Sequence, residues 1–119
     1  MKLIEYNTTA RQSDSRAEVQ FSIKGVIRFN RLATQTLGLT AGCFVSFYQD
    51  ADRPTDWYVK KTTHGAKVRA DHNNNGSMLC KYSEVSRKVL TLLKRDSARV
   101  LLANQPAEND MYAILTKSI

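Results

Sequence analysis

The sequence predicts a small α+β domain, mainly antiparallel sheet or a small barrel, with two short helices and internally duplicated β-α-β-β units. Two observations predict this fold. Residues 24–50 contain, in order, a strand, a capped short helix, a glycine stop and a second strand. Residues 82–117 repeat that order at nearly the same spacing, so pseudo-repeats are expected at about 17–61 and 77–117. At 119 residues the chain is long enough for one domain with a single core.

The first half is expected to open with strands. Residues 2–7 alternate weakly between apolar and polar side chains, which predicts a short N-terminal strand, followed by a polar loop up to residue 16. Residues 17–23 alternate strictly, which predicts a half-buried strand. The turn at Lys24 and Gly25 then returns the chain through residues 26–29 as a hairpin.

A short helix is expected to follow this hairpin. Asn30 suits its N-cap, because the side-chain oxygen can accept a free backbone N–H. Gly38 suits its end, because glycine has no Cβ to oppose a left-handed conformation. Residues 43–49 are apolar on both faces, which predicts a central strand, and residues 56–62 predict its antiparallel return.

The second half is expected to repeat this pattern around a longer helix. Ser83 is expected to cap a helix that runs to about Arg95. Glu84 in its first turn and Lys94 and Arg95 in its last turn would complement the helix dipole. Four strands complete the prediction, at residues 66–70, 77–82, 100–103 and 111–116.

Composition is that of an ordinary globular domain, with 42% hydrophobic and 24% charged residues. No apolar run approaches the ~20 residues that a membrane span needs, and the N-terminus lacks the apolar core of a secretory signal. A cytoplasmic protein without a membrane partner is therefore expected. Cys43 and Cys80 are expected to be small buried side chains in a reducing compartment, with a disulfide between the two halves as the alternative.

The charge balance favours a polyanionic partner. Eighteen Lys and Arg against eleven Asp and Glu give a net charge of +7, which favours nucleic acid through phosphate neutralisation but does not identify it. Basic residues concentrate around the first hairpin, before the second helix and along it. The candidate nucleic-acid contacts are Lys24, Arg28, Arg31, Lys81, Arg87, Lys88, Lys94 and Arg95.

Two further readings of these residues stay open. Arg87, Lys88, Lys94 and Arg95 share one face of the predicted helix with Thr91, and such a face can also be merely solvated. The aromatic residues of the central strands suggest core packing, with a stacking platform for single-stranded nucleic acid as the alternative. These aromatic residues are Phe47, Tyr48, Trp57 and Tyr58. Four further cations could extend a basic stripe, and they are Lys60, Lys61, Lys67 and Arg69.

No catalytic or metal-binding pattern competes with binding. His64 and His72 are the only histidines, and no Cys or carboxylate stands at metal-ligand spacing from them. The glycines lie scattered at turns and form no phosphate-binding loop. We therefore expect no enzyme activity, no metal, no cofactor and no small-molecule substrate.

A resemblance to a known family adds to this interpretation for residues 17–61. It rests on Gly25, the apolar strand Val26-Ile27, Leu37-Gly38-Leu39, Gly42 and the apolar strand that ends at Asp50. These residues resemble the AbrB/MazE-like swapped-hairpin family of transition-state regulators, which bind DNA as intertwined dimers, and residues 77–117 match as a degenerate second copy. The resemblance implies that the two halves of this chain imitate the family's dimer and share a small barrel with a basic face.

The chain departs from the family where the family reads DNA. Asn30 stands where the family usually has proline, and either residue suits a helix start. The arginines that the family commonly places after the glycine and within the helix are here Val26, Thr34 and Gln35. The resemblance therefore carries over the scaffold and not the contact residues.

Two hypotheses follow from the sequence. The first is a cytoplasmic nucleic-acid-binding regulatory or accessory domain that docks by electrostatics, with DNA favoured over RNA. The second is a protein-interaction or structural module that forms a homodimer or larger homo-oligomer, or binds a protein partner. They differ in salt dependence, because phosphate contacts weaken steeply as salt rises and apolar interfaces change little.

Overall fold

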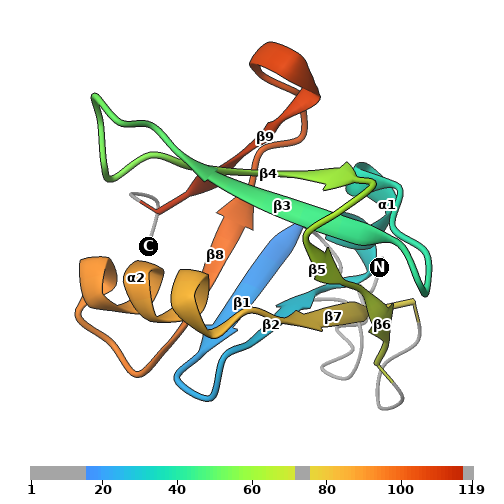
Figure 1. The fold of residues 1–119 in the computed structure, drawn as a ribbon, viewed down its shortest axis with the longest axis horizontal. Helices are drawn as coiled ribbons and strands as arrows, with labels where there is room; N and C mark the ends of the chain where they lie inside the picture. Colours follow the sequence, from blue (N-terminus) through green and yellow to red (C-terminus); the bar gives the residue numbers. More distant parts are fainter. Residues whose placement is uncertain (1–15, 72–75, 117–119) are drawn as a thin grey trace, which may run out of the picture.

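The computed structural model describes residues 16–71 and 76–116 (Figure 1). The predicted strand at residues 2–7 and His72 lie outside these ranges. The first half contains β1 (Glu18–Ser22), β2 (Val26–Phe29), α1 (Arg31–Leu37), β3 (Phe44–Gln49) and β4 (Trp57–Thr62). The second half contains β5 (Ala66–Lys67), β6 (Arg69–Ala70), β7 (Met78–Lys81), α2 (Ser83–Leu93), β8 (Ser97–Leu102), a 3-10 turn η1 (Glu108–Asp110) and β9 (Tyr112–Leu115).

The strands of the described ranges form one antiparallel sheet that nearly closes into a barrel. Their order is β5-β3-β4-β9-β8-β1-β2-β7-β6. The strands at the two ends of this order, β5 and β6, are separated in the chain only by Val68. The short segment 66–70 therefore pairs with β3 on one side and with β7 on the other, which joins the two edges of the sheet. Closing a sheet in this way covers edges that could otherwise pair with other chains.

Val68 stabilises the pairing between segment 66–70 and the chain around β3. Its backbone N–H donates to the carbonyl oxygen of Cys43 at 2.7 Å, and its own carbonyl accepts from the N–H of Gly42 at 2.8 Å. Its side chain is fully buried in the core. Val68 thus contributes both backbone hydrogen bonds and a buried apolar side chain where the two edges of the sheet meet.

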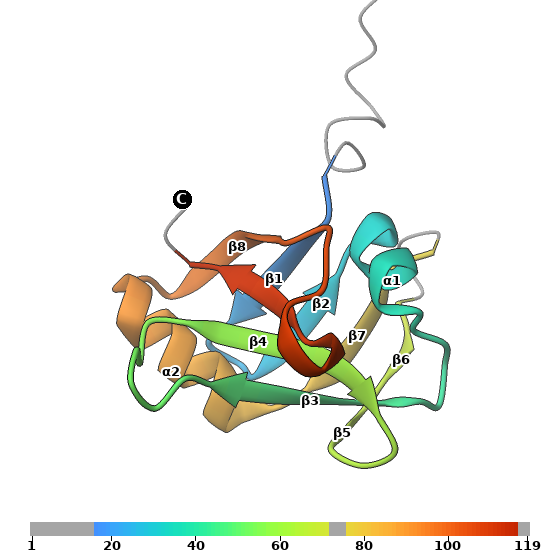
Figure 2. The ribbon, with the colours of Figure 1, turned by 90° about the horizontal axis from the view of Figure 1, so that it is seen from above.

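Alternate residues of the strands fill the barrel, and the two helices cover its opposite ends. Val19 and Phe21 of β1 and Ile27 of β2 are fully buried, as strand alternation requires. Val89 of α2 and Ala33 of α1 belong to the same core. Figures 1 and 2 show α1 and α2 at opposite ends of the barrel, so each helix closes one opening.

The predicted caps of the first helix are confirmed. The side-chain oxygen of Asn30 accepts the backbone N–H of Ala33 at 2.9 Å and also that of Glu18 at 3.1 Å, which ties the helix start to β1. Gly38 adopts a left-handed conformation with φ 70°. Its N–H then binds a carbonyl of the last helical turn, as expected for a glycine stop.

The prediction for the ends of the second helix is wrong. The helix begins at Ser83 itself, and Tyr82 holds the N-cap position without a side-chain hydrogen bond. A tertiary contact decides this start, because the N–H of Tyr82 donates to the carbonyl of Gly25 at 2.8 Å. The helix ends at Leu93, and Lys94 takes the left-handed position after it with φ 57°. Lys94 and Arg95 therefore follow the last turn rather than belong to it.

The structure confirms the predicted fold class in its coarse form, a mostly antiparallel sheet in a nearly closed barrel with two helices. Both cysteines are free thiols, Cys80 buried and Cys43 partly exposed. Burial, with a smaller contribution from Cys43, raises the pKa of Cys80 to about 12. Neither helix of the described ranges has the length and apolar character that crossing a membrane requires.

Candidate nucleic-acid interface

Two segments that are distant in the sequence, the β1–β2 turn and the stretch that contains α2, meet where α2 covers the barrel. The N–H of Ile23, in the turn between β1 and β2, donates to the carbonyl of Asp96, after α2, at 3.1 Å. The hydroxyl of Ser86, within α2, donates to the carbonyl of Ser22 at 2.6 Å. We call this region, residues 22–25 and 81–97, the α2 end. Its backbone contacts fix the positions of the side chains that it exposes.

Six of the eight predicted contact residues lie at the α2 end. All six are exposed, and they are Lys24, Lys81, Arg87, Lys88, Lys94 and Arg95. The same segments contain two acidic residues, Glu84 and Asp96, so six positive against two negative charges leave +4. The structure thus concentrates more than half of the chain's net charge of +7 at one end of the barrel.

Most of these cations have no carboxylate partner. Lys88 forms an ion pair with Glu84 at 3.4 Å. Within residues 16–71 and 76–116, the other five cations of the α2 end form no ion pair. The guanidinium of Arg87 makes only a long hydrogen bond of 3.4 Å, to the carbonyl of Ser83. Five positive charges are therefore free to meet an external anion.

The other two predicted contacts lie elsewhere. Arg28 faces outward from the middle of β2 and forms an ion pair of 3.3 Å with Asp71, whose side chain is only 4% exposed. Arg31 begins α1, which covers the opposite end of the barrel. Sequence proximity had grouped both residues with Lys24, but the barrel separates them from the α2 end.

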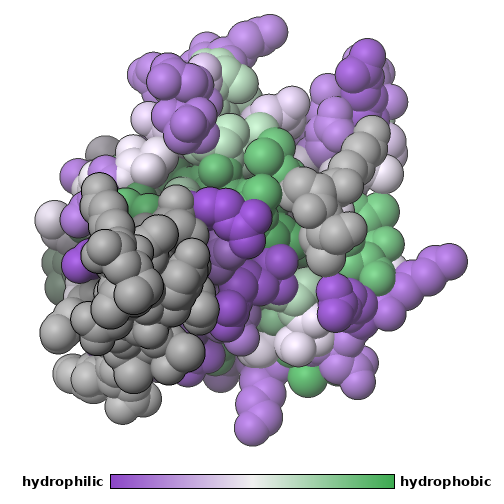
Figure 3. Space-filling view, turned by 180° about the vertical axis from the view of Figure 1, so that it is seen from behind, coloured by the Kyte–Doolittle hydropathy of each residue, from purple (hydrophilic) through white to green (hydrophobic). Residues whose placement is uncertain are grey.

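Arginines on the wall of the barrel are largely neutralised. Cross-strand pairs align Arg99 of β8 with Gln20 of β1 and Gln20 with Arg28. Glu18 contacts both Arg16 at 3.2 Å and Arg99 at 3.8 Å. Figure 3 views the molecule from behind, and hydrophilic residues gather near the centre of this view. The wall is polar, but two carboxylates, those of Glu18 and Asp71, contact its three arginines, whereas among the described residues five of the six cations at the α2 end have no such contact.

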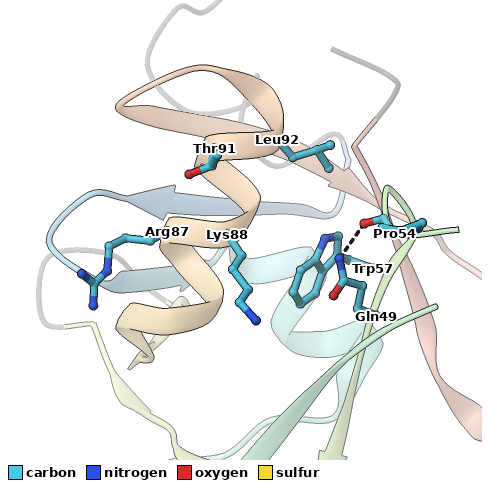
Figure 4. Close-up of a pocket in the computed structure, with 7 residues that line it drawn as sticks. All are labelled: Gln49, Pro54, Trp57, Arg87, Lys88, Thr91 and Leu92. Carbon is cyan, nitrogen blue, oxygen red and sulfur yellow. Dashed lines mark hydrogen bonds between the residues drawn. The ribbon is translucent and has the colours of Figure 1, made fainter. Parts of the chain in front are cut away.

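A groove of about 480 Å³ separates α2 from the loop between β3 and β4 (Figure 4). Lys88 extends along the groove beside Trp57, whereas Arg87 extends to the other side of the helix. Both residues nevertheless line the groove, with Arg87 at its edge. The groove is lined by Gln49, Pro54, Trp57, Arg87, Lys88, Thr91 and Leu92.

Sequence reasoning missed the β3–β4 side of this groove. Gln49 donates from its side-chain amide to the carbonyl of Pro54 at 2.7 Å, which shapes the loop, and Trp57 is 5% exposed and forms the floor. No local pattern links these residues to α2, because the contact arises only when the barrel closes.

The described residues contain no metal-binding cluster, since no three His, Cys, Asp or Glu side chains among them come close enough to hold an ion. Comparison of the chain with protein-family models, with curated proteins and with solved structures finds no match. The AbrB/MazE-like resemblance of residues 17–61 therefore stays a prediction.

Proposed function

We propose that the protein is a nucleic-acid-binding regulatory or accessory domain that docks onto the phosphate backbone of DNA through the α2 end. The observation that supports this proposal most strongly is the convergence of two distant chain segments at a surface of net charge +4 with five unpaired cations. Lysine and arginine contacts to phosphates supply most of the affinity of non-specific DNA binding. Such contacts position a protein on the duplex without reading its sequence.

The cations span the α2 end rather than one short motif. Lys24 comes from the β1–β2 turn, Lys81 from the end of β7, and Lys94 from the residue that follows α2. Because backbone hydrogen bonds join these segments, the backbone positions that carry the cations are fixed relative to one another before any ligand arrives. A preorganised set of cations loses less conformational freedom on binding than the same charges on a flexible tail.

Internal duplication is the second part of the proposal. The β1–β2 hairpin of the first half pairs with β8 of the second half, and segment 66–70 of the second half pairs with β3 of the first. Exchanging the halves, β1 with segment 66–70, β2 with β7, β3 with β8 and β4 with β9, leaves the order of strands around the barrel unchanged. This exchange supports two related halves with swapped hairpins, in accord with the AbrB/MazE-like resemblance.

A charge reversal tests the DNA proposal. Arg87→Glu combined with Lys94→Glu is expected to reduce binding of a random-sequence duplex at least tenfold in fluorescence anisotropy, because two phosphate attractions become repulsions. The matched control, Lys61→Glu with Arg69→Glu, changes the net charge equally but alters exposed positions of β4 and β6 outside the α2 end. Equal duplex affinity for wild type and the Arg87/Lys94 variant would refute docking through the α2 end.

One observation favours the second candidate function, a homodimer or protein complex. Ile23 is 59% exposed at the tip of the β1–β2 turn, within the α2 end. An apolar side chain among cations is typical of a protein contact with a charged rim. Under this function Ile23→Ser would convert a dimer to a monomer in sedimentation analysis, whereas a wild-type chain that sediments as a monomer would rule out the homodimer.

A further inference from the structure

The outer wall formed by β3, β4, β5 and β9 gathers aromatic residues and lysines. Tyr48 of β3 pairs directly with Tyr58 of β4, and Tyr58 pairs with Ala113 of β9. Residues directly opposite in adjacent strands share a face of the sheet, so both tyrosines point the same way. Phe44 lies further along β3 on that face, beside Lys67 of β5. We call Phe44, Tyr48, Tyr58, Lys60 and Lys67 the tyrosine wall.

This face points outward. The intervening residues Val45 and Val59 are fully buried in the core, whereas Phe44, Tyr48 and Tyr58 are partly exposed. The helices pack mainly on β1, β2 and β8. Figure 1 shows β3 and β4 crossing the front of the barrel, with the helices at its two ends. The aromatic side chains of the tyrosine wall therefore reach the outer surface of the barrel, where each is partly exposed.

Lysines border the rings at both ends. The ammonium group of Lys60 lies 5.9 Å from the centre of the Tyr48 ring and donates to the carbonyl of Asn109 at 3.1 Å. Lys67 is exposed beside Phe44, roughly 14 Å along β3 from Tyr48 at the usual rise of a strand. The acidic residues of η1 border the Lys60 side, so a polyanion is expected to approach along Lys67.

A hollow opens next to Tyr58. It measures about 350 Å³ and is lined by Asp56, Trp57, Tyr58, Ala113, Ile114, Leu115 and Thr116. Ala113, directly opposite Tyr58, has a small side chain, and Leu115 is 37% exposed nearby. A flat, partly apolar group such as a nucleobase fits this setting, with one face on the phenol ring and an edge in the hollow.

We propose that the tyrosine wall is a second binding surface, specific for single-stranded nucleic acid, with bases stacked on Tyr48 and Tyr58 and phosphates held by Lys67. Bases in a duplex are stacked on one another and cannot lie on a flat sheet, whereas single-stranded bases can. Neighbouring aromatic rings with lysines at the border complement a chain of bases and phosphates. This surface is distinct from the α2 end and does not depend on duplex binding there.

Tyrosine substitutions test the wall with a labelled 12-nucleotide oligo-dT. Tyr48→Ala and Tyr58→Ala are each expected to weaken binding roughly 5- to 100-fold in fluorescence anisotropy, the effect of removing one stacked base. Tyr48→Phe and Tyr58→Phe keep the ring and are expected to stay within about twofold of wild type. Thermal unfolding followed by circular dichroism identifies any variant that loses its fold, and Tyr48→Leu or Tyr58→Leu, which keeps apolar bulk without a ring, then replaces that Ala variant and is expected to show the same loss.

A reciprocal pair of variants separates this proposal from the function proposed above. The Arg87/Lys94 reversal should impair duplex binding and leave oligo-dT binding intact, and the two Tyr→Ala variants should do the opposite. Folded Tyr→Ala variants that bind oligo-dT as tightly as wild type would refute single-strand binding at the tyrosine wall. Tyr→Ala variants that change the oligomeric state but not the oligo-dT affinity would also refute it, because the tyrosine wall would then be a protein interface.

Discussion

Removal of Arg87 gives the sharpest quantitative test of the α2 end. Each cation that neutralises one phosphate adds about 0.9 to the salt slope of binding, so five unpaired cations predict a slope of about −4.5 and a loss of affinity of ~500-fold between 50 and 200 mM salt. Arg87→Ala leaves four such cations, a slope of about −3.6 and a loss of ~150-fold over the same range. The structure therefore predicts a change in slope as well as in affinity.

The neighbouring lysine provides an internal comparison. Lys88 is already paired with Glu84 at 3.4 Å, so Lys88→Ala should alter the slope much less than Arg87→Ala. Lys61→Ala removes an exposed cation outside the α2 end and should leave the slope unchanged. The assay is a fluorescence-anisotropy titration of a random duplex at four or more salt concentrations. A slope that is the same in wild type and Arg87→Ala, or that Lys61→Ala changes as much, would refute the assignment of phosphate contacts.

The remaining predictions concern stability and thiol chemistry. Gly25→Ala should cost about 1–3 kcal/mol in urea unfolding, because Gly25 has φ +89° and an added Cβ would collide with Ser83. Gly42→Ala, with φ +93° and open space around it, should cost less, and equal costs would contradict the contact. Ser86→Ala should cost about 1 kcal/mol through its lost hydrogen bond, whereas Thr91→Ala on the exposed face should change stability by less than about 0.5 kcal/mol. At pH 8 a thiol reagent should label Cys43 and spare Cys80 until the chain unfolds, because burial raises the pKa of Cys80 to about 12. Since the folded state then holds a proton that the unfolded state releases, stability should fall as pH rises from about 9 towards 12, and Cys80→Ala should flatten that fall.

Local patterns predicted the elements of this fold well where the local signal was strong. Strict alternation located β1, and Asn30 and Gly38 marked the start and end of α1, because a side-chain cap and a left-handed glycine act within a few residues. β8 begins at Ser97, three residues before the predicted strand. Its start is set by pairing with Ser22 of β1, and that pairing leaves no trace in the apolar pattern of β8 itself.

Contacts between distant segments account for what the sequence did not predict. The α2 end depends on the hydrogen bond between Ile23 and Asp96, which joins two turns far apart in the chain. Alternation indicated that Trp57 and Tyr58 point to opposite sides, but not which of them faces the core. The barrel decides this, with Trp57 inside and Tyr58 outside. The candidate residues were therefore readable from the sequence, whereas their grouping required the closed sheet.

The unequal charge of the two barrel ends has a physical explanation if the halves are related. In a homodimer every substitution appears at both ends, so a cationic helix at one end requires the same helix at the other. In a single chain each end can change alone, and residues 31–42 around α1 contain one cation, Arg31, whereas Arg87, Lys88, Lys94 and Arg95 lie in or directly after α2. The groove beside α2 also borders the tyrosine wall, since Trp57 lines both this groove and the hollow next to Tyr58. A duplicated single chain can thus present two adjacent and chemically different surfaces, which a symmetric dimer of either half would have to repeat on its opposite side.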